Sequence, residues 1–234
     1  MKYLSLLLCL FLGANAQAKT NWSDFSLTYL KGSNYELGDD DRRVYTFEHV
    51  AGTSWGDSFL FVDRLESDNG DNETYAEWQP RYKLTDLDKG VVTAVYLAGM
   101  VEMDSVSPNG DQGFSFTNYL AGFGTDVKIP GFDFFQANVY HRNNEIGDNN
   151  YQTTLVWGLP LGPLYFDGFI DYASSNDELS TSFNMTSQLK YDVAPQLGLT
   201  SKLYLGVEYV YWNNKFGVQG VDERNVNLLV KYHF

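Results

Sequence analysis

The last ten residues of the chain alternate apolar and mostly polar side chains. One set of alternate positions is apolar, and the other is mostly polar: Val226, Leu228, Val230, Tyr232 and Phe234 against Asn225, Asn227, Leu229, Lys231 and His233. Successive side chains of a β-strand point to opposite faces, so a period of two is typical of a strand whose two faces differ. The sequence therefore predicts that the chain ends in a strand with one apolar and one mostly polar face.

The same alternation recurs along most of the chain. Near the start, Phe25, Leu27 and Tyr29 alternate with Ser26 and Thr28. Segments of this kind are bounded by stretches rich in Gly, Pro, Asn and Asp, which favour turns. The predicted strands are 22–30, 42–51, 57–65, 73–84, 91–103, 114–127, 132–142, 150–159, 164–173, 182–193, 201–212 and 223–234. The sequence thus predicts an all-β protein of about twelve strands.

The connections between these segments fall into two alternating classes. Short turns are predicted at 52–56, 85–90, 128–131, 160–163 and 194–200. Longer polar loops are predicted at 31–41, 66–72, 104–112, 143–149, 174–181 and 213–222. Antiparallel neighbours reverse direction at each connection, so all the turns lie at one end and all the loops at the other. This predicts a closed antiparallel barrel with both chain ends on the turn side.

Two architectures give this alternation, and they place the apolar row oppositely. A soluble sandwich turns it toward a core. A membrane barrel turns it toward lipid, where a charge near the midplane costs about 2–4 kcal/mol. Trp78, Tyr82, Tyr29 and Tyr211 lie near the ends of predicted strands, where membrane barrels carry aromatic girdles. We therefore expect a transmembrane antiparallel β-barrel with apolar residues outward and charged residues inward.

The first residues indicate export. A basic second residue precedes an apolar run over 3–12, and residues 14–16, Ala-Asn-Ala, fit the small-residue pattern of a signal peptidase site. We expect residues 1–16 to be a cleaved signal peptide and residues 17–234 to form the barrel. Cys9, the single cysteine, would leave with that peptide, so no disulfide is expected.

Composition excludes some partners. Thirty acidic and 16 basic side chains give a formal net charge of −14, which disfavours nucleic acid because phosphate binding needs a basic surface. The sequence has no run of 18 uncharged apolar residues, as a membrane-spanning helix would need. It does have 17 Tyr, 16 Phe and 5 Trp, more rings than an aliphatic core requires.

Enzymatic chemistry has little support in the sequence. His49, His141 and His233 have no partners at a spacing typical of a Ser-His-Asp triad. Asp167 and Asp171 share one predicted inward face, where a pair of carboxylates is better explained as lumen lining than as a catalytic dyad. Acidic runs such as 39–41 lack the spacing of a calcium-binding EF-hand loop. We expect no enzyme, no cofactor and no metal site.

The C-terminal aromatic residue has a further implication. A last strand that ends in Phe234 after alternating apolar positions resembles the insertion signal of outer-membrane β-barrels. The resemblance implies that the barrel assembly machinery recognises this strand and that the protein is located in the outer membrane of a Gram-negative bacterium.

Several segments resemble the nucleoside-specific Tsx channel family of outer-membrane proteins. Residues 77–87 carry its Pro-Arg pair before a turn, residues 119–126 resemble its Gly-x-Gly-Thr-Asp strand end, and Asn-Val-Tyr follows at 138–140. Residues 59–63 are similar to its aromatic-x-aromatic-x-Asp strand. This chain is shorter than usual members, with trimmed loops. The resemblance implies a monomeric barrel of twelve strands with a narrow channel for nucleosides or similar small solutes.

Candidate solute-binding residues follow from the inward rows. Phe59 and Phe61 share a face with Asp63, so the rings face the lumen if the carboxylate does. A planar base could stack on them while carboxylates bind sugar hydroxyls. Glu77 and Arg81 belong to a mixed set of inward charges. The candidates are Phe59, Phe61, Asp63, Glu77, Arg81, Tyr165, Asp167, Phe169 and Asp171.

Other interpretations remain open at this point. The inward rings could pack on one another as a plug. A barrel filled in this way would act as a structural protein or a receptor through its acidic loops. A third alternative is a general small porin, whose lumen is open but does not discriminate among solutes.

Overall fold

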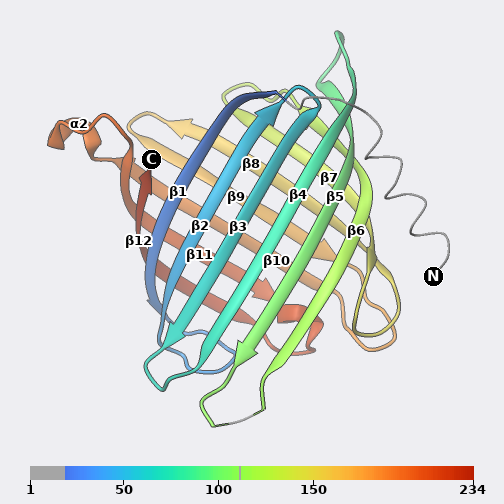
Figure 1. Cartoon of the computed structure of the whole chain (residues 1–234), viewed down its shortest axis with the longest axis vertical. Coiled ribbons are helices and arrows are strands. Elements are labelled where there is room, and N and C mark those ends of the chain that lie inside the picture. The colour runs from blue at the N-terminus through green and yellow to red at the C-terminus, as the bar shows by residue number, and fades with distance from the viewer. Residues whose placement is uncertain (1–18, 111) are drawn as a thin grey trace.

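The computed structural model describes residues 19–110 and 112–234. These residues form a closed antiparallel barrel of twelve strands, as predicted (Figure 1). The predicted signal peptide, residues 1–16, lies outside the described residues. The strands are β1 (Thr20–Ser33), β2 (Arg42–Thr53), β3 (Gly56–Ser67), β4 (Asn72–Asp86), β5 (Val92–Ser107), β6 (Phe114–Val127), β7 (Phe134–Asn143), β8 (Asn150–Leu161), β9 (Leu164–Ala173), β10 (Ser182–Asp192), β11 (Leu203–Asn213) and β12 (Glu223–His233).

Closure of the barrel depends on pairing between its first and last strands. Leu27 pairs with Tyr232 and Tyr29 with Val230 in antiparallel register. Each other strand pairs with its sequence neighbours, so within the described residues every strand has a partner on both sides. Closure removes the unpaired edges that an open sheet would expose.

The strand boundaries differ from the predicted ones by four residues at most. The ranges 114–127 and 164–173 coincide, whereas β5 continues to Ser107 instead of ending at 103. Two short helices lie in the connections, α2 (Ala194–Leu197) and the 3₁₀ helix η1 (Lys215–Gly217). Among the described residues, no helix is both long and apolar enough to cross a bilayer.

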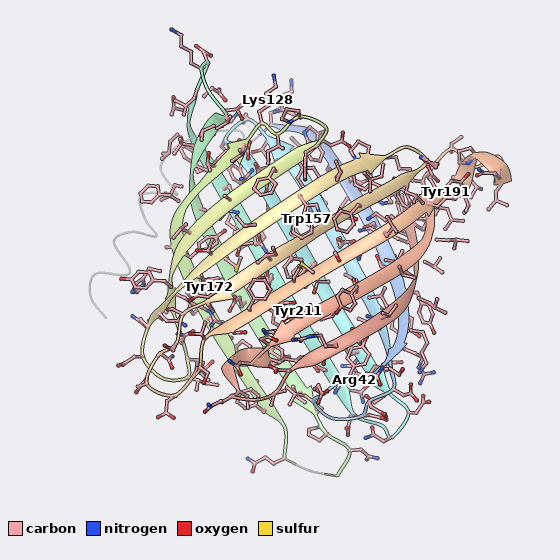
Figure 2. All side chains as sticks on the ribbon, turned by 180° about the vertical axis from the view of Figure 1, so that it is seen from behind. Arg42, Lys128, Trp157, Tyr172, Tyr191 and Tyr211 are labelled. Carbon is pink, nitrogen blue, oxygen red and sulfur yellow. The ribbon has the colours of Figure 1, made fainter. Side chains whose placement is uncertain are left out.

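The two faces of the wall are assigned as predicted. On β1, Phe25, Leu27 and Tyr29 are exposed on the outside, whereas Ser26 and Thr28 are almost completely buried inside the barrel. Figure 2 shows side chains along the wall, among them Tyr172, Tyr191 and Tyr211. The outward rows therefore form an apolar surface of the kind that lipid covers.

Outward aromatic residues lie toward both ends of this surface. The Tyr82 ring is exposed near the turn end of β4, whereas Trp78, which is also exposed, lies near the middle of that strand. Near the loop end, Tyr29 and Tyr45 have ring centroids 5.5 Å apart, and Arg224 covers Tyr211 with its guanidinium carbon 3.5 Å from the ring centroid. This distribution matches the aromatic girdles of membrane barrels.

The interior is not uniformly polar. One buried apolar cluster consists of Leu30, Tyr35, Val44, Leu65, Tyr204 and Leu229, and another of Ala98, Met100, Leu120 and Tyr140. These side chains occupy inward positions that the alternation alone would assign to a polar lumen. They fill part of the barrel and leave a narrower passage.

The connections are arranged as the sequence predicts. The connections predicted as turns lie at the end where β1 begins and β12 finishes, and those predicted as loops lie at the other end (Figure 1). Their lengths overlap, because the β10–β11 connection, 193–202, which contains α2, is longer than the β3–β4 loop, 68–71. We call the two ends of the barrel the turn end and the loop end.

Candidate functional site

A central cavity of about 660 Å³ occupies the barrel interior. Its lining includes seven of the nine predicted solute-binding residues: Phe59, Phe61, Asp63, Glu77, Asp167, Phe169 and Asp171. These side chains come from β3, β4 and β9. The strict alternation along each strand directs them inward.

Arg81 and Tyr165 are placed differently from the other seven. The Arg81 guanidinium is buried between Asp57 and Asp126, at 2.6 and 3.0 Å, and lies 4.2 Å from the centroid of the Tyr96 ring. Arg81 thus joins β4 to β3 and β6. The Tyr165 ring centroid lies 5.8 Å from Lys190 Nζ.

The inward basic side chains are held in ion pairs. Besides Arg81, the inward Arg and Lys pairs among the described residues are Arg42 with Glu73 at 2.7 Å, Arg142 with Glu102 at 2.6 Å, Lys190 with Asp167 at 2.7 Å, Lys215 with Glu223 at 2.8 Å, and Lys231 with Glu48. His233 Nδ1 lies 2.6 Å from Asp24 Oδ2. A cation paired in this way is largely unavailable to an anionic solute.

Other inward carboxylates have neutral partners. Glu77 accepts hydrogen bonds from the Tyr75 hydroxyl at 2.5 Å and from Gln79 Nε2 at 2.6 Å. Asp171 accepts one from the Thr154 hydroxyl at 2.5 Å. Glu208 accepts from Gln188 at 2.9 Å and from Asn227 at 3.1 Å. Carboxyl groups therefore outnumber cations inside the barrel, and the cations are already paired, so the interior offers an anion little attraction.

The two predicted rings belong to a longer series. The ring centroids of Phe59 and Phe61 are 5.9 Å apart, and Tyr75 follows Phe61 at 5.8 Å. The next steps lead to Phe216 at 6.3 Å, Phe116 at 6.1 Å and Phe114 at 6.0 Å. Consecutive aromatic contacts thus extend from β3 to the loop end of β6.

Four rings of this series were not predicted as site residues. Tyr75 and Phe116 occupy inward positions of β4 and β6, as Glu77 and Asn118 do two residues further along. Alternation could have identified these two. Phe216 lies in the connection between β11 and β12, where no periodic signal places a side chain.

The β11–β12 connection is folded into the loop end of the barrel. Lys215 is only 5% exposed, and its ammonium lies 5.0 Å from the Trp212 ring centroid. Phe216 has a left-handed backbone (φ 55°), which is uncommon for a bulky residue. Gly217 follows with φ 79°, and a Cβ there would lie 2.8 Å from that of Leu179. Anchoring and close packing thus hold the Phe216 ring inward.

A second cavity, of about 340 Å³, lies above the central one at the loop end. We call it the vestibule. Each of the six loops contributes to its lining: Leu37, Asp71, Pro108, Ile146, Leu179 and Val218 are examples. Phe116 and Phe216 line both cavities. These rings therefore stand between the vestibule and the central cavity.

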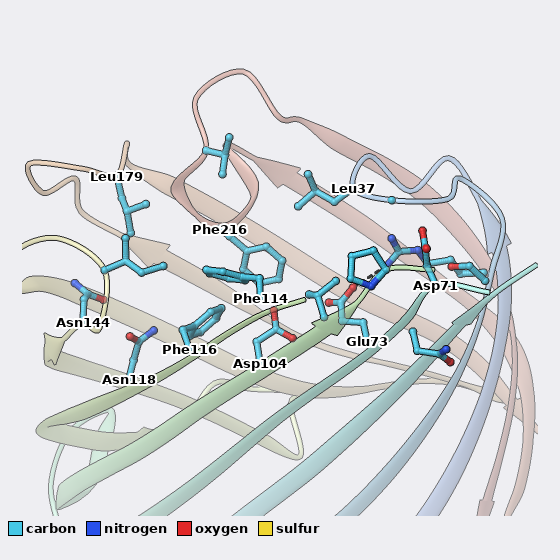
Figure 3. Close-up of a pocket in the computed structure, with 18 of the residues that line it drawn as sticks. Leu37, Asp71, Glu73, Asp104, Phe114, Phe116, Asn118, Asn144, Leu179 and Phe216 are labelled. Atoms are coloured by element: carbon cyan, nitrogen blue, oxygen red, sulfur yellow. Dashed lines mark hydrogen bonds and ion pairs between the residues drawn. The ribbon is translucent and has the colours of Figure 1, made fainter. Parts of the chain in front are cut away.

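Asp104 is a buried acidic residue of the vestibule. Its side chain lies beside the Phe114, Phe116 and Phe216 rings (Figure 3). The residue is 4% exposed, and Oδ1 has no hydrogen-bond partner among the described residues. The vestibule thus combines aromatic surface with a buried acidic group.

Acidic loop residues link neighbouring loops to each other. Asp39 accepts hydrogen bonds from the Asp41 and Asn69 amides, and Asp71 accepts from the Asn109 amide at 2.7 Å. Backbone N–H groups favour the ionised form, so they hold the pKa of both carboxyls below its usual value. The loops are therefore cross-linked by hydrogen bonds as well as solvated.

Comparison with known proteins gives a relative and a shared fold. No protein-family model matches the sequence. The chain is 28% identical over 175 residues to the outer membrane protein OmpK of Vibrio parahaemolyticus serotype O3:K6 (strain RIMD 2210633), a match covering 64% of this chain and 63% of OmpK. This chain thus matches less than two thirds of that relative's length.

Solved structures of the KdgM porin have the same fold. One of them, and another in complex with disordered oligogalacturonate, align at TM-scores of 0.52 and 0.51. Each alignment has 12% identity and covers 89% of this chain and 99% of the porin. At this identity the similarity establishes the fold: a closed, porin-like barrel of twelve antiparallel strands.

Proposed function

We propose that the protein is an outer-membrane channel through which small solutes, nucleosides foremost, diffuse passively. The membrane location is supported by the relative named as an outer membrane protein and by the exposed apolar rows of the wall. The channel is supported by the porin fold and the central cavity. No energy source is required, because solutes move down their gradients.

The aromatic series is the observation that carries the choice of solute. Its steps of 5.8–6.3 Å between ring centroids give a planar solute a new ring to contact at each stage. Stacking of a base on an aromatic side chain contributes about 1–3 kcal/mol. Several sites of this strength allow a solute both to enter and to leave, as conduction requires.

Polar groups beside the rings suit a neutral solute with hydroxyl and amino groups. Asp63, Glu77 and Asp171 line the cavity together with Gln79 and Gln152. Carboxylates accept hydrogen bonds from sugar hydroxyls or base amino groups, and amides can donate as well as accept. An uncharged nucleoside offers both kinds of group.

Anionic solutes fit the interior poorly. The KdgM porin has been solved with oligogalacturonate, an acidic sugar chain. In this chain the inward cations are ion-paired and carboxylates are in excess. The shared fold therefore gives no reason to transfer that solute to this protein, whose interior is better suited to neutral solutes.

The proposal extends to export and assembly. Residues 1–16 would direct export and be removed, the strand ending at Phe234 would engage the barrel assembly machinery, and the folded protein would be a monomer. Phe234 is exposed at the turn end of the barrel, and its amide donates to the Phe25 carbonyl at 3.0 Å. Its ring thus remains exposed in the closed barrel.

Removing the first two rings tests the proposal. Phe59→Ala combined with Phe61→Ala should weaken nucleoside block of the channel by roughly five- to 150-fold per ring lost, with ion conductance spared or raised. Single-channel recording in planar bilayers measures both quantities. Phe123→Ala is the matched control, because that ring faces outward and is highly exposed. Unchanged block in the double variant would remove both rings from the site.

A closed barrel that acts through its loops is the second candidate. It is favoured by Phe116 and Phe216 between the two cavities and by the hydrogen bonds between loops. A closed barrel would carry no steady current in a planar bilayer. A general porin would carry a current that nucleosides do not change.

A further inference from the structure

Three basic residues face outward at the loop end of adjacent strands. Lys31, Arg43 and Arg64 lie on β1, β2 and β3, in the same rows as the outward residues Tyr29, Tyr45 and Val62. Each row is apolar toward the middle of the barrel and becomes cationic only near the loops. We call these three residues the basic patch.

Their register places like charges together. Lys31 and Arg43 are direct partners in the β1–β2 pairing, and Arg64 pairs with Tyr45, two residues from Arg43. Like charges directly opposite one another on one face destabilise a sheet. An anion bound between them would relieve that repulsion.

Carboxylates near the patch neutralise it only in part. Asp41 lies 4.0 Å from Lys31 Nζ, and Asp68 lies 3.2 Å from Arg43. Glu66 is the register partner of Arg43 on β3. Asp41 and Asp68 are highly exposed loop residues, so these pairs are weak and open to competition from a stronger anion.

Arg64 is the best-prepared member of the patch. Its guanidinium donates to Thr74 Oγ1 at 3.0 Å and to Asn72 Oδ1 at 2.8 Å. Both partners are neutral, and among the described residues no carboxylate lies within 4.0 Å of its nitrogens. The side chain is thus oriented while its charge remains uncompensated.

The patch is confined to one side of the barrel. In the part of the chain that the structure describes, β4 to β11 carry no outward Lys or Arg near the loop end. Arg224 on β12 also lies at this end, but it donates to the Trp212 and Glu223 carbonyls and stacks on Tyr211. A general preference for basic residues at this level would not give such a restricted distribution.

We propose that the basic patch binds the phosphate groups of a phosphorylated lipid in the outer leaflet, with the lipid's acyl chains on the apolar rows below. Guanidinium groups form strong charge-assisted hydrogen bonds with phosphate oxygens. The Tyr29 and Tyr45 rings mark the level at which headgroups meet the hydrocarbon. Outer-membrane barrels carry their longer loops outside the cell and their short turns in the periplasm, so the loop end of this barrel would lie at the outer leaflet. The inference depends on the proposed function for this membrane location and not for the solute.

Lipid binding can be measured on the purified barrel in detergent by native mass spectrometry. Diphosphoryl lipid A is the probe, and phosphatidylethanolamine and inorganic phosphate are the competitors. We expect one lipid A to remain bound in excess of either competitor. Lys31→Gln, Arg43→Gln and Arg64→Gln combined should weaken that binding by about tenfold or more, because charge-assisted hydrogen bonds are lost.

The matched control changes three cations at the turn end. Lys83→Gln, Lys89→Gln and Lys202→Gln alter the net charge equally at exposed positions and should leave binding unchanged.

Arg64→Gln alone removes a side chain with only neutral partners and should weaken binding in a barrel that still folds. The proposal would be overturned if the patch variant bound lipid A as well as wild type does, or if the control variant lost as much lipid A binding as the patch variant. Displacement of lipid A by either competitor would also overturn it. Nucleoside block of the patch variant should match wild type, which separates this test from that of the channel.

Discussion

For a single residue, alternation predicts whether the side chain faces inward but not which residues it contacts. Alternation places Arg81 inward but does not identify its partners, because Asp57 and Asp126 come from two other strands. Arg81, predicted as a solute contact, therefore lies outside the lining of the central cavity and serves as a buried structural link. Phe59 and Phe61, by contrast, line the cavity as their alternation with outward residues predicts.

Phe216 is the residue whose removal should change the passage most. Its ring joins Tyr75 to Phe116 and lines both cavities. Phe216→Gly would remove the ring and also suit the left-handed backbone there, which glycine adopts without strain. We expect higher single-channel conductance and weaker nucleoside block, with the heat-dependent gel shift of the folded barrel retained. Conductance equal to that of wild type would show that the ring does not separate the cavities.

Among the elements, the connections differ most from what the sequence predicts. Strands such as β6 and β9 coincide with the predicted ranges because alternation continues to their ends. The inward fold of η1 depends on the Lys215–Glu223 pair and on packing of Gly217 against Leu179. Such contacts between distant segments have no period, so the sequence alone could not place Phe216 at the site.

The acidic loops should keep their connections well into the acid range. The carboxyl groups of Asp39 and Asp71 have pKa values below the ordinary 3.8. When folding lowers the pKa of a carboxyl, the ionised group stabilises the folded structure fully at pH values above its ordinary pKa. That stabilisation is lost only as the pH falls through the lowered pKa. Hydrogen exchange of the Asn69 and Asn109 amides, corrected for intrinsic rates, should therefore be constant from pH 7 to about 4 and accelerate below that.

A substitution at neutral pH gives the corresponding result. Asp71→Asn removes the charge that accepts the Asn109 amide at 2.7 Å, so exchange over the β3–β4 and β5–β6 loops should accelerate at pH 7. Asp88→Asn, at an exposed turn-end position, should have no effect on these loops. Equal exchange in Asp71→Asn and wild type would contradict a linking role for this carboxylate.

At the scale of the whole molecule, closure of the barrel depends on the last strand. Deleting Phe234 removes an exposed terminal ring and the hydrogen bond from the Phe234 amide to the Phe25 carbonyl. We expect the variant to be exported but poorly inserted, because the terminal aromatic residue is part of the proposed insertion signal. The amount of heat-shifted band in isolated outer membranes measures this. Wild-type amounts after the deletion would refute the proposed signal.

The barrel combines an apolar outer wall, an acidic interior and a series of six rings that leads from the loop end into the lumen. The wall and the barrel were predictable because they follow from a period of two. The length of the ring series was not, since it requires a loop residue to meet two strands.

Nucleoside conduction is tested most simply by single-channel recording of the wild-type protein in a planar bilayer, across a nucleoside titration. We expect a steady current that a nucleoside blocks in a saturable way and that an acidic sugar of similar size does not block. A steady current indifferent to nucleosides, or no current at all, would contradict nucleoside conduction.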